Sequence, residues 1–207
     1  MSQPVPLLPG HIYHIFNRGN NRENIFREPR NYPYFLGLYA QHVLPAVDTF
    51  AYCLMRNHFH LLVRLKTEAE IKDPAGFQKP AGSSGNTLNV SQCLSNFFNA
   101  YTKTINNGYA RTGSLFEKPF KRIEVTSDDY FTNLIFYIHF NPQKHGFVND
   151  FREWPWSSFE AMLNQAPSKI QREQVLSWFG DAARFKAFHQ GAVDERMIQH
   201  LIEEDFD

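Results

Sequence analysis

Residues 48–66, DTFAYCLMRNHFHLLVRLK, contain two strand-forming segments joined by a short polar link, and this stretch constrains the fold most strongly. It is rich in aromatic and aliphatic residues and is too long for a single strand. Arg56 and Asn57 interrupt it, and asparagine tolerates the left-handed backbone that tight turns often need. The stretch therefore predicts an antiparallel β-hairpin that turns at Arg56 and Asn57.

The segments around this hairpin alternate between strand and helix character. Residues 11–18 predict a strand followed by the turn residues Gly19-Asn20-Asn21, and residues 119–125 predict a fourth strand. Helices are predicted at residues 30–43, 91–107 and 126–142, the last disturbed at its end by Pro142. The order is ferredoxin-like. We therefore expect an α+β fold, a ferredoxin-like antiparallel sheet (βαββαβ) with one further helix and a C-terminal helical extension.

The domain organisation follows from this order and from composition. A chain of 207 residues can bury one substantial core, and we expect a main domain over residues 1–150. Residues 67–90 are rich in Gly, Pro and Ser and predict a mobile loop within that domain. Residues 151–207 contain short helical pieces with aromatic side chains, as in REQVLSWFG, and are expected to pack on it as a helical extension.

The charge distribution is asymmetric although the formal net charge is zero. Residues 1–122 hold 14 Lys and Arg against 7 Asp and Glu, a net charge of +7, and the remainder has −7. The basic part is suited to holding phosphates, and the alternative is ordinary solvated surface charge. There is no long apolar run and no secretory signal pattern, and Cys53 and Cys93 suggest neither a disulfide framework nor a zinc site. These features indicate a cytoplasmic protein without a membrane span.

His58 and His60 are two residues apart in the second half of the hairpin. On a strand they share one face, while the apolar residues at 59, 61, 63 and 65 form the opposite face, which we expect to be the core. Two neutral imidazoles side by side can share one metal ion. The alternative is a pair of ordinary strand histidines, because a chain with nine histidines produces such a spacing easily by chance.

Tyr137 and Asn141 form a second candidate pair, on the helix predicted at residues 126–142. Their spacing of four places both side chains on one helix face. A tyrosine hydroxyl, with a pKa of about 10, can attack a phosphodiester if a cation polarises the phosphate. The alternatives are a core aromatic residue for Tyr137 and a helix-ending residue before proline for Asn141.

Taken together, LMRNHFHLLV and FYIHFNPQKHGFV resemble motifs of the single-tyrosine HUH transposases, particularly the REP-associated tyrosine transposases. FNRGNNRENIF, GSLFEKPFKRIEV and WPWSSFEAM extend the resemblance over roughly residues 10–162. It implies that Tyr137 is the nucleophile. It also implies that His58, His60 and Asn141 hold a divalent cation, Mg²⁺ or Mn²⁺.

The resemblance also implies a reaction and a substrate. The enzyme would cleave and rejoin single-stranded DNA next to a hairpin, with REP-like repeats as partner, through a 5′-phosphotyrosine and without ATP. It would act as a monomer or a homodimer. The candidate DNA-binding residues, with Phe116 and Phe120 interleaved, are Arg18, Arg22, Arg111, Lys118, Lys121 and Arg122. The alternative for this set is solvated cations and core phenylalanines.

Two other functions remain open on the sequence. A DNA-hairpin binding or regulatory module derived from a transposase would keep the fold without turnover. A hydrolytic metalloenzyme for small substrates would need a carboxylate base, and none stands beside the histidines. The acidic end EEDFD would repel DNA or shield the basic part, unless it is simply a solvated tail.

Overall fold

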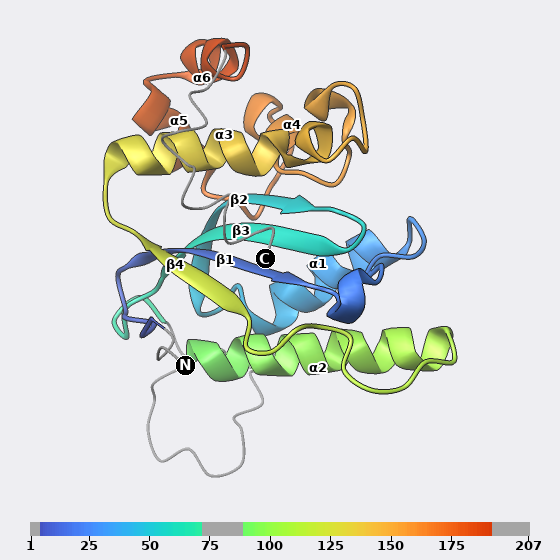
Figure 1. The fold of residues 1–207 in the computed structure, drawn as a ribbon. Coiled ribbons are helices and arrows are strands. Elements are labelled where there is room, and N and C mark those ends of the chain that lie inside the picture. The colour runs from blue at the N-terminus through green and yellow to red at the C-terminus, as the bar shows by residue number, and fades with distance from the viewer. Residues whose placement is uncertain (1–4, 72–88, 192–207) are drawn as a thin grey trace.

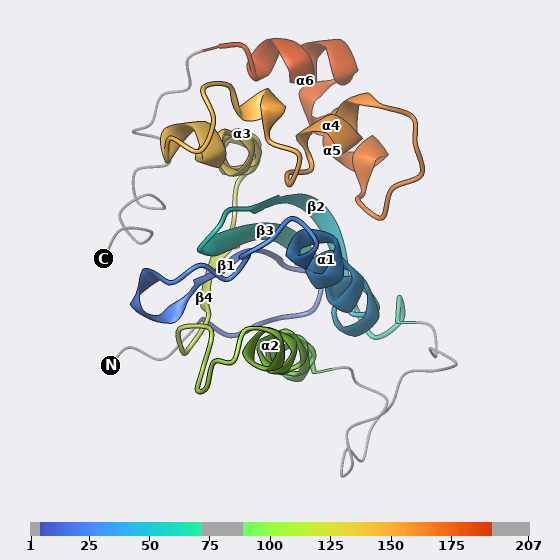
Figure 2. The same cartoon turned by 90° about the vertical axis from the view of Figure 1, so that its right-hand side faces the viewer.

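In a computed structural model, which describes residues 5–71 and 89–191, the chain forms a four-stranded antiparallel sheet between two layers of helices (Figures 1 and 2). The strands lie in the order β2-β3-β1-β4, so that β1 and β3 are central. Their bounds are β1 (Ile12–Arg18), β2 (Val47–Leu54), β3 (His58–Leu65) and β4 (Lys121–Val125). Together with α1 (Asn31–His42) and α2 (Val90–Gly108), this confirms the predicted ferredoxin-like βαββαβ fold.

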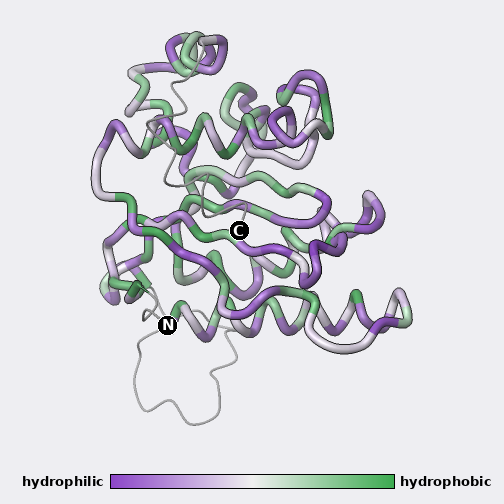
Figure 3. The backbone as a smooth tube through the Cα atoms, viewed as in Figure 1, coloured by the Kyte–Doolittle hydropathy of each residue, from purple (hydrophilic) through white to green (hydrophobic). Residues whose placement is uncertain are grey.

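Each face of the sheet has its own hydrophobic core. Helices α1 and α2 cover one face, and α3 (Asp128–Lys144) covers the other together with three short helices (Figure 2). These are α4 (Phe159–Leu163), α5 (Arg172–Phe179) and α6 (Ala182–Phe188). Hydrophobic residues alternate with hydrophilic ones along the helices (Figure 3), as expected for helices that pack one face on the sheet. None of the described helices is long and apolar enough to cross a membrane.

The β2–β3 hairpin closes through a three-residue connection, in which Met55 N–H donates to the carbonyl of His58 at 2.9 Å. The hairpin turns at Arg56 and Asn57 as predicted, but neither residue is left-handed, since the described non-glycine residues with positive φ are Asn21, Arg22 and Ala110. A three-residue connection leaves room to reverse the chain without that conformation. Instead, Asn21 and Arg22 adopt it in the short 3-10 turn η1 (Asn20–Arg22), where the turn after β1 was predicted.

Helix α3 begins where the sequence predicts and ends later. The hydroxyl of Ser127 accepts the N–H of Tyr130 and caps the helix, and two aspartates occupy its first turn. Pro142 does not end the helix, which continues to Lys144. A proline so close to the end removes a single backbone donor, and its own carbonyl accepts Phe147 N–H at 2.9 Å.

The segment after residue 150 packs along the outer strand β2. Leu54 N–H donates to Trp156 at 2.9 Å, Ser158 N–H to Tyr52 at 2.9 Å, and Gln171 N–H to Thr49 at 2.8 Å. These bonds occupy backbone groups that an edge strand otherwise leaves open. The expected short helices are present here, whereas the acidic end of the chain and residues 72–88 of the expected loop lie outside the described residues.

Candidate functional site

The alternation of β3 puts His58 and His60 on the face of the sheet that α3 covers. Phe59 and Leu61 point to the opposite core, under α1 and α2, as predicted. The histidine face is also enclosed: His60 is fully buried, and Leu62 belongs to the core beneath α3. Because helices cover both faces of the sheet, the two imidazoles lie at the end of the interface between α3 and the sheet and not on an open sheet surface.

Tyr137 and Asn141 of α3 meet these histidines. The rings of His58 and His60 lie 5.3 Å apart at 86°, and the ring of Tyr137 stands edge-on to His60 at 5.7 Å. Asn141 is fully buried and donates through Nδ2 to the carbonyl of Tyr137 at 3.1 Å. It also lies near enough to His58 to raise that imidazole's pKa by hydrogen bonding, against the larger lowering by burial. One chain therefore brings all four predicted residues together.

The donor groups in this cluster are in the form that binds a divalent cation. Burial lowers the pKa of His60 to about 3 and that of His58 well below its ordinary value, with neighbouring cationic side chains adding to both effects. Both imidazoles are therefore neutral at neutral pH, as a ligand must be. The oxygen Oδ1 of Asn141 is buried, and His58 is the neighbouring side chain with which Asn141 interacts.

This set fits a cation that accepts nitrogen and oxygen ligands. Within the described parts of the chain, no three His, Cys, Asp or Glu side chains are grouped to hold a metal ion. A metal at this place would therefore depend on the amide of Asn141 beside the two imidazoles.

Two further side chains complete the cluster, and sequence reasoning missed them. The ammonium of Lys144 lies 5.1 Å from the centroid of the Tyr137 ring, and the ring of His145 lies 5.0 Å from that of His58. Lys144 is seven residues after Tyr137, which is two helical turns. This spacing in the sequence already indicates that both side chains lie on one helix face. Tyr137 itself is only 1% exposed, so its hydroxyl is covered in this conformation.

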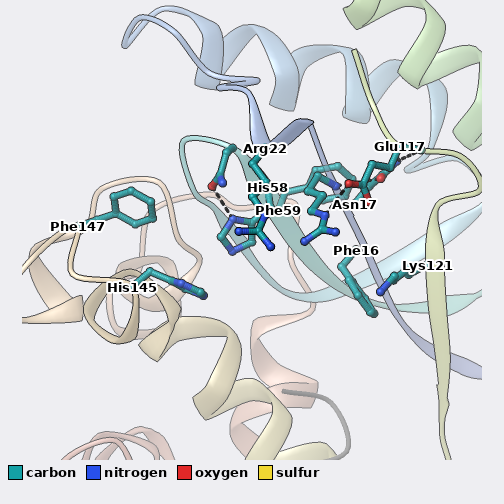
Figure 4. A pocket seen from close by; sticks show the side chains of 11 residues that line it. Phe16, Asn17, Arg22, His58, Phe59, Glu117, Lys121, His145 and Phe147 are labelled. Carbon is teal, nitrogen blue, oxygen red and sulfur yellow. Dashed lines mark hydrogen bonds and ion pairs between the residues drawn. The ribbon is translucent and has the colours of Figure 1, made fainter. Parts of the chain in front are cut away.

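A cleft of about 330 Å³ opens beside His58 (Figure 4). It is lined by Phe16, Asn17, Arg18, Arg22, Asn57, His58, Phe59, Glu117, Lys121, His145 and Phe147. Figure 4 shows His145 reaching from the end of α3 toward His58, and Lys121 next to Phe16. Arg18 forms an ion pair with Glu117 at 2.6 Å. The cleft thus combines three cations with aromatic walls, a composition suited to a nucleic-acid strand.

The predicted basic set is divided by the fold. Arg18, Arg22 and Lys121 line the cleft, and Lys118 is exposed in the loop before β4. Arg111 and Arg122 do not line it.

Arg111 pairs with Glu23, and the guanidinium of Arg122 donates to the carbonyl of Val5 at 2.6 Å. Arg122 pairs with Ile15 in the β1–β4 ladder and therefore points to the other face of the sheet from Lys121. Phe116 is buried in the core under α1 and α2, so its ring is not available to stack on a base.

Comparisons with known proteins agree with the motifs. No family model matches the chain. A protein of Haemophilus influenzae named "Putative REP-associated tyrosine transposase" is 25% identical over 117 residues, which cover 54% of this chain and 58% of that protein. The chain thus matches a little over half of its curated relative's length.

A solved structure of a REP-associated tyrosine transposase bound to a REP hairpin matches with a TM-score of 0.56. It is 15% identical and covers 78% of this chain and 84% of that one, so it establishes the fold. The resemblance that the motifs indicate is confirmed by both comparisons.

Proposed function

We propose that this chain, which resembles REP-associated tyrosine transposases in sequence and in fold, cleaves and rejoins single-stranded DNA beside a hairpin. The observation that carries the proposal is the meeting of Tyr137 and Asn141 with His58 and His60 at the edge of a basic cleft. A module that only held DNA would not need a phenol, two neutral imidazoles and a buried amide oxygen at one point.

In the proposed reaction, the hydroxyl oxygen of Tyr137 attacks a backbone phosphate. A bond forms between the tyrosine oxygen and phosphorus, and the bond from phosphorus to the 3′ oxygen breaks. The phenol gives up its proton and the leaving oxygen takes one up as a free 3′-hydroxyl. The product is a 5′-phosphotyrosine, and the reverse attack by a 3′-hydroxyl rejoins the strands. One phosphodiester replaces another, so no ATP is required.

His58, His60 and Asn141 are the residues that would hold a divalent cation, Mg²⁺ or Mn²⁺, which would polarise the scissile phosphate. Arg18, Arg22 and Lys121, which line the cleft, would bind the phosphates on either side.

Tyr137 is 1% exposed, so its side chain has to turn toward the cleft before it can attack. In this conformation the ring contacts Lys144 and His60, so the turn would break both contacts.

The proposed substrate is hairpin DNA with an adjacent single-stranded segment, of the REP type. The support is the name of the curated relative and the REP hairpin bound in the similar solved structure. Because a single chain supplies all four residues of the cluster, a monomer has a full set.

The test is incubation of wild type, Tyr137→Phe and Tyr130→Phe with hairpin DNA and Mn²⁺, followed by denaturing electrophoresis. Tyr130 lies on the same helix, and its replacement controls for loss of a tyrosine there. We expect a covalent adduct in wild type and Tyr130→Phe that EDTA abolishes, and none in Tyr137→Phe. An adduct in Tyr137→Phe would refute the assignment of the nucleophile.

A hairpin-binding module without turnover is the second candidate, and the burial of Tyr137 is the observation that favours it. It predicts equal hairpin binding with and without Mn²⁺ and no adduct in any variant. The same gel, with a binding assay run in parallel, distinguishes the two functions.

A further inference from the structure

Both imidazoles of the His58–His60 pair are held through the same ring atom, Nδ1. Nδ1 of His58 lies 2.8 Å from Oδ1 of Asn57, and Nδ1 of His60 lies 2.9 Å from Nε2 of His14. A neutral imidazole has one N–H and one lone pair, and the partner of one nitrogen decides which remains at the other. Asn57 and His14 therefore control what His58 and His60 present to the cation site.

For His58 the direction of the hydrogen bond is fixed by chemistry. An amide oxygen only accepts, so Nδ1 of His58 carries the proton and Nε2 keeps its lone pair. Asn57 is itself held in place, because its carbonyl accepts the N–H of Gly19 at 2.8 Å, and Gly19 follows the last residue of β1. The end of one central strand thus positions the side chain that orients the first histidine of the other.

For His60 the partner comes from β1. His14 is fully buried and sits diagonally across the β1–β3 ladder, where Phe16 pairs with His60 and His14 with Leu62. The two imidazole planes differ by 17° with centroids 5.1 Å apart. With 2.9 Å between the nitrogens, this is the arrangement of an in-plane hydrogen bond rather than a face-to-face stack.

This bond can run in either direction, and only one direction leaves His60 able to bind a cation through Nε2. If His14 accepts through Nε2, its own proton is on Nδ1, His60 is protonated at Nδ1, and Nε2 of His60 keeps its lone pair. If His14 donates, the proton of His60 moves to Nε2 and blocks it. Metal-binding histidines usually donate their other N–H to a neighbouring acceptor, which fixes ring orientation and tautomer.

We infer that Asn57 and His14 are positioning residues that hold His58 and His60 in the Nδ1–H tautomer, so that both Nε2 lone pairs serve one divalent cation. This inference rests on the proposed function for the use of the cation. It assigns a task to His14 and Asn57, which neither the motif spacing nor the cleft explains.

The first measurement is the tautomer of His60 and His58 in the metal-free protein. Long-range ¹H–¹⁵N spectra of histidine-labelled protein at neutral pH distinguish a protonated from an unprotonated ring nitrogen. His58→Gln and His60→Gln variants assign the signals. We expect a protonated Nδ1 and an unprotonated Nε2 in both residues. A protonated Nε2 in His60 would overturn the assignment of His14.

The second measurement is Mn²⁺ affinity, followed by the electron paramagnetic resonance signal of free Mn²⁺ without DNA. His14→Phe keeps an aromatic ring but removes the hydrogen-bond acceptor of His60. Asn57→Leu removes the acceptor of His58. Each is expected to weaken Mn²⁺ binding by about 10- to 100-fold.

Variants that restore an acceptor should recover most of the affinity. His14→Gln and Asn57→Asp provide a carbonyl and a carboxylate oxygen at these positions. Cys53→Ala is the packing control, because Cys53 faces His60 on the neighbouring strand and has a buried side chain. Its Mn²⁺ affinity should stay near that of wild type.

Wild-type Mn²⁺ affinity in both His14→Phe and Asn57→Leu would refute the inference. If His14→Phe fails to fold, the tautomers of the wild-type protein and the Mn²⁺ affinities of Asn57→Leu and Asn57→Asp still test the inference. The outcome is separable from the proposed function: the expected tautomers and affinities without any Tyr137 adduct would support the positioning roles and count against strand transfer.

Discussion

Replacing His189 by glutamine is expected to flatten the dependence of folding stability on pH. His189 follows α6 and is buried, with Nδ1 donating to the carbonyl of Phe185 at 2.8 Å. Its Nε2 lies 3.0 Å from Nδ1 of His139 on α3, whose Nε2 lies 2.8 Å from the hydroxyl of Ser158. The direction of these hydrogen bonds is fixed. Because Nδ1 of His189 donates, its Nε2 has to accept the N–H of His139, and a proton on that Nε2 would place two N–H donors against each other.

The magnitude follows from the pKa of His189, which burial lowers to about 4. An unfolded histidine has a pKa of about 6.5, so the unfolded chain takes up this proton first as the pH falls. The free energy of unfolding therefore decreases between about pH 6.5 and 4. At about 1.4 kcal/mol per pH unit, His189 contributes a loss of roughly 3 kcal/mol over that range.

The assay is urea unfolding, followed by tryptophan fluorescence, at about pH 7, 6 and 5. His189→Gln is expected to lose stability at neutral pH but to fall less steeply than wild type below about pH 6.5, by about 1.4 kcal/mol per pH unit. Ser158→Ala removes one of these hydrogen bonds without removing an ionisable group, and should keep the steep fall. Equal slopes in wild type and His189→Gln would refute the reasoning.

Three further predictions concern the cleft and its cluster. Gly19→Ala places a Cβ 2.2 Å from the carbonyl oxygen of Glu23, so chemical denaturation should show a loss of about 1–3 kcal/mol, and unchanged stability would contradict this. Lys121→Gln should lower the salt dependence of hairpin binding by about 0.7–0.9 in the log–log slope, whereas Arg122→Gln, on the other sheet face, should not. Asn141→Leu should fold but bind Mn²⁺ more weakly when free Mn²⁺ is followed by electron paramagnetic resonance, since the substitution removes the buried oxygen. Undiminished Mn²⁺ affinity would exclude Asn141 as a ligand.

The order of strands and helices was predictable because it depends on local patterns. The alternation along residues 58–65 is enough to separate the histidine face from the apolar face, and the structure agrees. The spacing of Tyr137 and Asn141 likewise predicted a shared helix face. Backbone detail was less predictable: the hairpin turns at Arg56 and Asn57 without a left-handed residue, and α3 continues past Pro142 to Lys144.

The neighbours of the predicted residues were out of reach because they depend on strand pairing. His14 approaches His60 only through the β1–β3 register, which no local pattern reveals. The basic set shows the opposite case. Lys121 and Arg122 are consecutive in a strand, so alternation alone implies that they point to opposite faces, and grouping them as one surface was avoidable.

The polarity of the DNA bond to Tyr137 tests the proposed strand transfer most directly. Hairpin DNA with a single-stranded segment is labelled at its 5′ end in one sample and at its 3′ end in another. Each sample is incubated with the protein and Mn²⁺, and the products are then separated under denaturing conditions. We expect the 3′-labelled part to become attached to the protein. The 5′-labelled part should be released with a 3′-hydroxyl that a polymerase can extend. Attachment of the 5′-labelled part, or cleavage without attachment of either part, would contradict a 5′-phosphotyrosine intermediate.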